Sequence, residues 1–281
     1  MKSDALPAAN KKPSKLRWYQ YTLRSLLLLT LLVAIGMSYV EVMLQNGRKQ
    51  TAAAEAIRKS GGYVTTERTW LGKLLQNDSF VQVVCVGGPY LFTDDGLEHL
   101  EGLRQLKKLE LDAASVTDAG LVHLNGLSQL QDLRLKSTEI TDDGLAHLEE
   151  LKQLVSLTLS DTGVTGAGLA HLQGLNNLRS LSLEHSAITD AGLIHLQGLH
   201  RLVLLNLSDD GITDAGLVHL RGLSQLEHLD LSGTLITDAR LSHLQGLRQL
   251  RALKLTGTKV TYQGVNTLQR VLPNCKIEFK Y

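Results

Sequence analysis

Apolar positions recur along most of the chain with a fixed period. From Phe92 onward, one apolar position returns every 24 residues without an insertion. The members of this column are Phe92, Val116, Ile140, Val164, Ile188, Ile212, Ile236 and Val260. A period of this length is typical of a solenoid, in which each repeat buries its apolar side against its neighbours. The sequence therefore predicts eight stacked repeats over residues 92–281.

The first half of each repeat carries a helical pattern. In residues 116–139, Leu121 and Leu124 have the i, i+3 spacing of one face of a helix. Thr117 or Asp118 is expected to cap that helix, because its side-chain oxygen can accept hydrogen bonds from free amide groups. A short helix on the outside of each repeat is the prediction.

The second half of each repeat carries a strand pattern. Leu133 and Leu135 alternate with polar residues, as in a strand that is buried on one side. One strand and one short helix per repeat predict an α/β solenoid. The spacing resembles the leucine-rich repeat, whose pattern L-x-x-L-x-L-x-x-N/T-x-L is matched by Leu130, Leu133, Leu135, Thr138 and Ile140. The resemblance implies a horseshoe with a parallel concave sheet and short convex helices. A closing strand is expected at the C-terminus.

An uninterrupted apolar stretch precedes the repeats. Residues Ser25 to Val40 carry no charge, and a helix of this length is about 24 Å long, somewhat short of a hydrocarbon core of roughly 30 Å. Snorkelling of Arg24 and interfacial aromatic residues can cover the difference. The aromatic residues are Trp18, Tyr19, Tyr21 and Tyr39. One transmembrane signal anchor is predicted over residues 18–42, and a cleaved signal peptide is the alternative.

The charges on either side of this stretch predict its orientation. Six Lys and Arg residues lie between Lys2 and Arg24, and four lie between Arg48 and Lys59. The positive-inside rule then makes residues 1–17 a cytoplasmic basic tail and puts the repeats on the extracytoplasmic side of the membrane. Residues 43–91 are predicted to form a juxtamembrane helix and an N-terminal cap over the first repeat. The apolar candidates for covering it are Trp70, Leu71, Leu74 and Leu75.

Three segments outside the repeat core resemble a group of bacterial membrane-anchored leucine-rich-repeat proteins. They are "RWYQYTLRSLLLLTLLVAIGMS", "AIRKSGG" and the closing "LPNCKIEF". The resemblance implies an uncharacterised binding role rather than catalysis. The partner that we expect is a protein. The near balance of 29 Lys+Arg against 28 Asp+Glu argues against nucleic acid. No phosphate-binding glycine loop, H-E-x-x-H or G-x-S-x-G motif occurs, so neither an enzyme nor a cofactor is expected.

The outward positions of the strands are where the repeats differ from one another. Charged residues occupy both ends of the predicted concave face, small hydroxyl residues occupy its middle, and no aromatic residue offers a strong anchor. The candidate ligand-binding residues are Arg134, Thr158, Ser160, Ser182, Glu184, Asn206, Ser208, His228 and Asp230. Recognition of a protein on this face is the favoured function. The alternative is a structural envelope protein that assembles laterally and has no dedicated ligand.

Two sets of residues raise the question of metal binding. Asp161, His185 and Asp209 stack directly after the strands, where a spacing of about 5 Å makes a cation site possible, with solvated loop charge as the alternative. The second set is a histidine column with the same period on the convex side, where side chains diverge too far to share a zinc ion. Its members are His99, His123, His147, His171, His195, His219 and His243. Each ring is expected to pack on the next helix and to bond a neighbouring turn.

Overall fold

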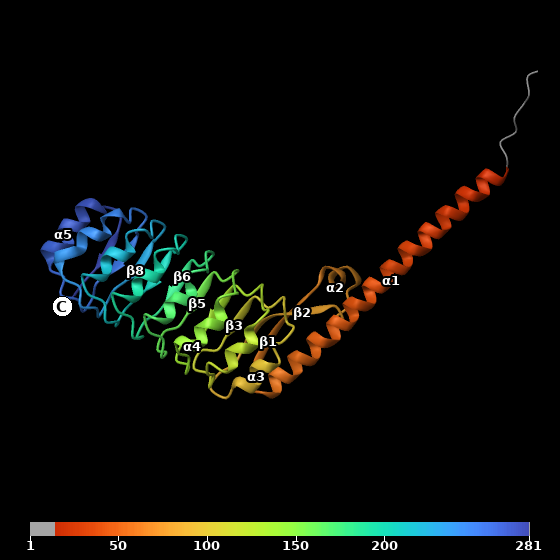
Figure 1. Ribbon diagram of the computed structural model, residues 1–281, viewed down its shortest axis with the longest axis horizontal. Coiled ribbons are helices and arrows are strands. Elements are labelled where there is room, and N and C mark those ends of the chain that lie inside the picture. The colour runs from red at the N-terminus through yellow and green to blue at the C-terminus, as the bar shows by residue number, and fades with distance from the viewer. Residues whose placement is uncertain (1–14, 281) are drawn as a thin grey trace, which may run out of the picture.

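The structure, a computed structural model, describes residues 15–280 as a long N-terminal helix, a small cap and an elongated stack of repeats (Figure 1). Most of the predicted basic tail, residues 1–14, lies outside the described residues, as do the side chains of Trp18, Tyr19 and Tyr21. Helix α1, Lys15–Lys59, is a single helix of 45 residues. The predicted anchor and the predicted juxtamembrane helix are therefore one continuous element.

One sheet of ten strands runs along the stack in chain order. From β2 (Val81–Gly87) to the last strand all neighbours are parallel, and β1 (Tyr63–Arg68) pairs with β2 in the antiparallel sense. The repeat strands are β3 (Lys108–Glu110), β4 (Asp132–Arg134), β5 (Ser156–Thr158), β6 (Ser180–Ser182), β7 (Leu204–Asn206), β8 (His228–Asp230), β9 (Ala252–Lys254) and β10 (Lys276–Glu278). Each pairs with the next at a register of 24 residues, as in Leu109 opposite Leu133. This confirms the predicted parallel solenoid.

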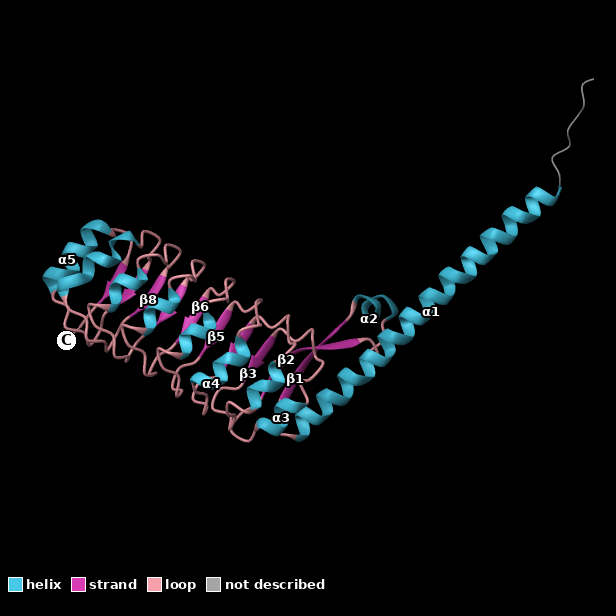
Figure 2. Ribbon diagram, in the orientation of Figure 1, coloured by secondary structure: helices cyan, strands magenta, loops and turns pink. Residues whose placement is uncertain are grey.

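Short helical elements line the other side of the stack (Figure 2). Most are single 3₁₀ turns rather than α-helices, because each repeat gives only about five residues to this side. They are α3 (Asp94–Glu98), η1 (Gly120–Leu124), α4 (Asp142–Leu145), η2 (Ala146–Leu148), η3 (Gly168–Leu172), η4 (Gly192–Leu196), η5 (Gly216–Leu220), η6 (Asp238–Gly246) and α5 (Tyr262–Val271). The predicted short convex helices are present.

The leucines of the repeat fill the space between sheet and helices. Leu121, Leu124, Leu133 and Leu135 are fully buried, and their equivalents are buried through the array up to the closing strand, where Ile277 and Phe279 are partly buried. The apolar column that starts at Phe92 is buried throughout as well. One continuous core runs from the cap to the last helix, so each repeat is stabilised mainly by its neighbours.

The aspartate predicted as a helix cap acts between repeats instead. Asp118 accepts hydrogen bonds from the backbone N–H of Thr141 (2.8 Å) and from its hydroxyl (2.6 Å), one repeat further along. The other pairs of this kind are Asp94–Thr117, Asp142–Thr165, Asp190–Thr213, Asp214–Thr237 and Asp238–Thr261. The threonine takes the capping role within its own repeat, because Thr117 Oγ1 accepts a hydrogen bond from the N–H of Ala119 (3.3 Å). We call this series the Asp–Thr ladder.

The cap has the predicted elements but buries different residues. A helix, α2 (Trp70–Leu75), joins β1 to β2. Only Leu71 of its four apolar candidates is buried; Trp70, Leu74 and Leu75 are exposed, which corrects the prediction that they cover the first repeat. The C-terminal end of α1 covers it instead, through Ala54 and Ile57, and Gln50 of the same helix accepts a hydrogen bond from the N–H of Val83 (2.8 Å).

Candidate functional site: the outward face of the sheet

The outward side of strands β3–β10, here called the sheet face, carries the side chains that vary between repeats. In β3–β9 the middle residue is a buried leucine, and the residues on either side of it point to solvent. Of the nine residues predicted to bind a ligand, seven are at least partly exposed. Ser160 and Ser208 are buried, which corrects their assignment as contact residues. Ser160 bonds Ser182 (2.9 Å), and Ser208 donates to Asn206 Oδ1 (2.8 Å), so both support neighbours.

The N-terminal end of the sheet face is a cluster of charges that pair with each other. Glu110 lies at its centre: its Oε1 is 2.7 Å from Lys108 Nζ and 3.4 Å from Arg134 Nη1. The hydroxyl of Tyr63, from the cap, donates to the other oxygen of Glu110. The bonds from Lys108 and Tyr63 hold the pKa of Glu110 below its usual value, whereas burial and the Glu110 bond raise the pKa of Tyr63. Arg134 also pairs with Asp112.

The C-terminal half of the sheet face is open and less polar. A pocket of about 210 Å³ lies over strands β7, β8 and β9. It is lined by Leu204, Leu205, Asn206, His228, Leu229, Asp230, Ala252 and Lys254. Leu204 is 39% exposed, an uncommon position for an aliphatic side chain on a polar face. On its rim, Lys254 Nζ lies 3.0 Å from Asp230 Oδ2, and this bond raises the pKa of Lys254.

Sequence reasoning found part of this pocket and missed the rest. Asn206, His228 and Asp230 were predicted as ligand contacts, whereas Leu204 and Lys254 were not. The available signal was the type of residue at outward strand positions: Leu204 is a large aliphatic residue in a column of otherwise polar or small ones.

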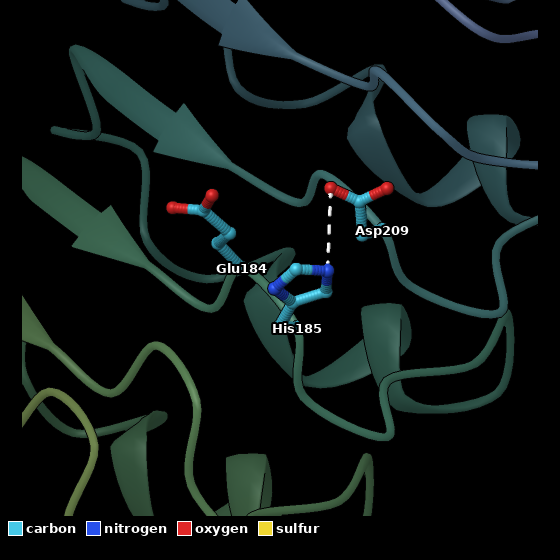
Figure 3. A group of neighbouring side chains, drawn as sticks. All are labelled: Glu184, His185 and Asp209. Atoms are coloured by element: carbon cyan, nitrogen blue, oxygen red, sulfur yellow. Dashed lines mark ion pairs between the residues drawn. The ribbon is translucent and has the colours of Figure 1, made fainter.

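The column directly after the strands stacks as predicted. Nδ1 of His185 lies 3.2 Å from Asp161 Oδ1. Nε2 of the same ring lies 3.6 Å from Asp209 Oδ2 (Figure 3). All three residues have left-handed backbone conformations, with φ between 55° and 58°. The same position is filled by Gly233 and Gly257 further along, as expected where φ is positive.

This column has ligand-type side chains, but they already hold one another. Ligand atoms of Glu184, His185 and Asp209 lie within 4.8 Å of one another. Figure 3 shows the imidazole paired with Asp209, which follows the neighbouring strand β7, while Glu184 directly precedes His185 after β6. Two carboxylates and an imidazole are suitable ligands for a divalent cation. Both ring nitrogens of His185 face carboxylates, however, and His185 and Asp209 are exposed. The geometry is that of a surface charge ladder.

Comparison with known proteins identifies the repeat. A leucine-rich-repeat family model matches residues 204–260, and a second one matches residues 174–196. The chain carries leucine-rich repeats, and its fold is a leucine-rich-repeat solenoid. Leucine-rich repeats are typically non-enzymatic scaffolds for protein interaction.

Two solved structures are similar to this one. Internalin C2 from Listeria monocytogenes str. 4b F2365 is 23% identical, with a TM-score of 0.55 over 72% of this chain and 82% of that one. The leucine-rich-repeat ectodomain of the plant membrane receptor kinase GASSHO1/SCHENGEN3 from Arabidopsis thaliana, in complex with CASPARIAN STRIP INTEGRITY FACTOR 2, is 17% identical, with a TM-score of 0.49 over 71% of this chain and 24% of that one. No curated protein matches the sequence.

Five members of the histidine column link consecutive repeats of this leucine-rich-repeat solenoid. His123 Nδ1 lies 2.8 Å from Glu101 Oε1, and His219 Nδ1 lies 2.9 Å from Gln197 Nε2. His171, His195 and His243 make the same contact with Glu149, Gln173 and Arg221. A partner in a neighbouring turn was predicted, and the structure supplies a side chain of the preceding repeat rather than a backbone group. These histidines thus have a structural explanation.

Proposed function

We propose that this chain is a single-pass membrane protein whose repeats bind a protein partner through the C-terminal half of the sheet face. The cytoplasmic position of the N-terminus and the extracytoplasmic position of the repeats are part of the proposal. The single observation that carries the recognition function is the open pocket over β7–β9, with an exposed leucine on a face that is otherwise polar.

The exposed surface of α1 supports the anchor. An 18-residue window within Thr22–Lys59 has a mean hydropathy of 2.2, and none of it is buried in the protein. A signal sequence has the same properties. Continuity favours an anchor, because the helix that holds the apolar stretch also supplies Ala54 and Ile57 to the core of the cap.

The character of the sheet face supports binding of a polypeptide. Protein-binding surfaces combine an apolar centre with a polar rim, and Leu204 and Ala252 lie here among His228, Asp230 and Lys254. The pocket is small and holds no aromatic anchor, so the affinity of a single contact is expected to be modest. An extended segment lying across several strands would add contacts to Asn206, Ser182 and Thr158.

Photo-crosslinking in cells that produce the full chain tests the proposal. A photoreactive amino acid is placed at Leu204 and, as a matched control, at Leu235, an exposed leucine in a loop outside the pocket. Discrete adducts with another protein from position 204, absent from position 235, are expected. Adducts between two copies of this chain would favour lateral assembly, and equal labelling from both positions would contradict recognition at the pocket.

A further inference from the structure

Helix α2 exposes three large apolar side chains at the end of the cap. Trp70, Leu74 and Leu75 have 60%, 69% and 53% of their surfaces exposed. Helix α2 lies at the tip of the β1–β2 hairpin, beside α1 and away from the repeats (Figure 1). We call this set of three side chains the tip. Adjacent exposed apolar residues of this kind are typical of an interaction surface.

The tip is fixed in place and cannot turn inward. The hydroxyl of Thr69 caps α2 by accepting from the N–H of Gly72 (3.3 Å), and Leu71 and Gly72 are the residues that α2 buries. Gly47 of α1 lies so close to the hairpin that a Cβ atom there would be 2.0 Å from the carbonyl oxygen of Ser79. This approach holds the hairpin against α1, so the three apolar side chains stay directed to the outside.

Counting along α1 gives the height of the tip above the apolar stretch. Leu44 and Leu75 line the same hollow between α1 and the hairpin. Leu44 follows Val40 by four residues, a rise of about 6 Å along the helix. The headgroup layer on each side of a bilayer is roughly 5–8 Å thick. With residues up to Val40 in the hydrocarbon, the membrane-side end of this hollow, at Leu44, is level with the headgroups, and a tilt of α1 toward the side that carries α2 brings Leu75 nearer to them.

The chemistry of the tip fits that layer. Tryptophan is enriched at membrane interfaces because its ring is amphipathic, and the two leucines add apolar surface that can enter the acyl boundary. Lys73, exposed on the same helix, can extend its amine to lipid phosphates. We propose that the tip docks on the lipid surface beside the anchor. The proposal rests on the membrane anchor proposed above, and it makes the cap a second attachment that orients the repeats.

The two tryptophans of the chain allow the anchor and the tip to be tested separately. The full chain is reconstituted in vesicles of phosphatidylcholine and phosphatidylglycerol, with and without lipid brominated near the headgroup. In the Trp18→Phe chain only Trp70 fluoresces, and in the Trp70→Phe chain only Trp18 does. We expect bromolipid to remove most of the emission of both. In the Trp18→Phe chain, adding Leu74→Ser and Leu75→Ser should restore much of the Trp70 emission, whereas the matched control Leu235→Ser should not.

The outcomes separate the two proposals. Quenching of Trp18 without quenching of Trp70 would overturn docking of the tip and leave the anchor standing. If Trp70 is shielded from aqueous iodide but is not quenched by bromolipid, a second copy or another protein covers the tip. That result would also overturn docking of the tip on lipid. If neither tryptophan is quenched, both the anchor and the tip proposals fail.

Discussion

The two ends of the sheet face are built from the same repeat, but their side chains differ: those at the N-terminal end pair with one another, and those in the C-terminal half leave an open surface. At the N-terminal end, Glu110, Lys108 and Arg134 pair with one another and with the cap. In the C-terminal half two residues depart from the repeat pattern. Leu204 is apolar at a position whose side chain is exposed, and Asp210 is acidic at a position whose side chain is buried. The charged end is thus held together by ion pairs within the protein, whereas the open half is marked by two residues whose polarity does not match their positions.

The buried Asp210 gives the largest expected effect. Burial raises its pKa from 3.8 to about 8, and Oδ2 has no hydrogen-bond partner among the described residues. Above about pH 4 the unfolded chain releases this proton, while the folded chain keeps it until about pH 8. The free energy of unfolding should therefore fall across that window. Asp210→Thr should raise it by roughly 2–4 kcal/mol at pH 8 and much less at pH 5, as measured by denaturant titration in detergent micelles.

A matched variant controls for charge alone. Asp209→Asn removes a neighbouring carboxylate that is exposed, and it should leave the pH dependence almost unchanged. If Asp210→Thr unfolds with the same pH slope as the original chain, the buried carboxyl is not the cause. Threonine is the appropriate replacement, since Thr138, Thr234 and Thr258 fill the same position and donate to a backbone carbonyl three residues earlier.

Binding at the pocket is the next largest effect. Leu204→Asp should weaken capture of the crosslinked partner by roughly tenfold or more, as expected for an apolar contact at the centre of an interface. Ser156→Asp puts the same charge in the same column two strands away and should change capture by less than about twofold. Similar losses from both variants, measured by titrating the purified partner, would show that charge anywhere on the face disturbs binding.

The charged end should contribute to stability and not to binding. Glu110→Gln should lower the free energy of unfolding by about 1 kcal/mol. Because partners hold the pKa of Glu110 low, its contribution is present above its ordinary pKa and is lost as the pH falls below that value. Glu139→Gln, in an exposed turn, is the control. Loss of partner capture in Glu110→Gln would contradict the division between the two ends.

The smallest effect is expected at the column after the strands. His185→Gln should change the free energy of unfolding by no more than about 0.5 kcal/mol, because exposed ion pairs contribute little. The same denaturant titration measures it. Tight stoichiometric uptake of zinc by the chain, lost in His185→Gln, would instead make this column a metal site.

The sequence predicted the parts of the molecule that repetition determines. The buried columns of Leu133 and Leu135 and the stacking of Asp161, His185 and Asp209 all follow from a period of 24 residues. Contacts between repeats were harder to predict, because a local rule competes with them: Asp118 is a good helix cap in isolation, yet it bonds Thr141. The cap was predicted least well, since pattern alone does not say whether α1 or α2 covers the first repeat.

The Asp–Thr ladder has one gap, at Gly166, which cannot offer Thr189 a carboxylate. There the two backbones approach each other instead: a Cβ on Gly166 would lie 2.8 Å from the Cα of Gly192. Every other pair of consecutive repeats from Asp94 to Thr261 has an Asp–Thr bond at this position, whereas this pair has only the close backbone fit there, in addition to the sheet and the core that join all repeats. Under a pulling force applied between the membrane and a captured partner, we expect the stack to part first at this joint.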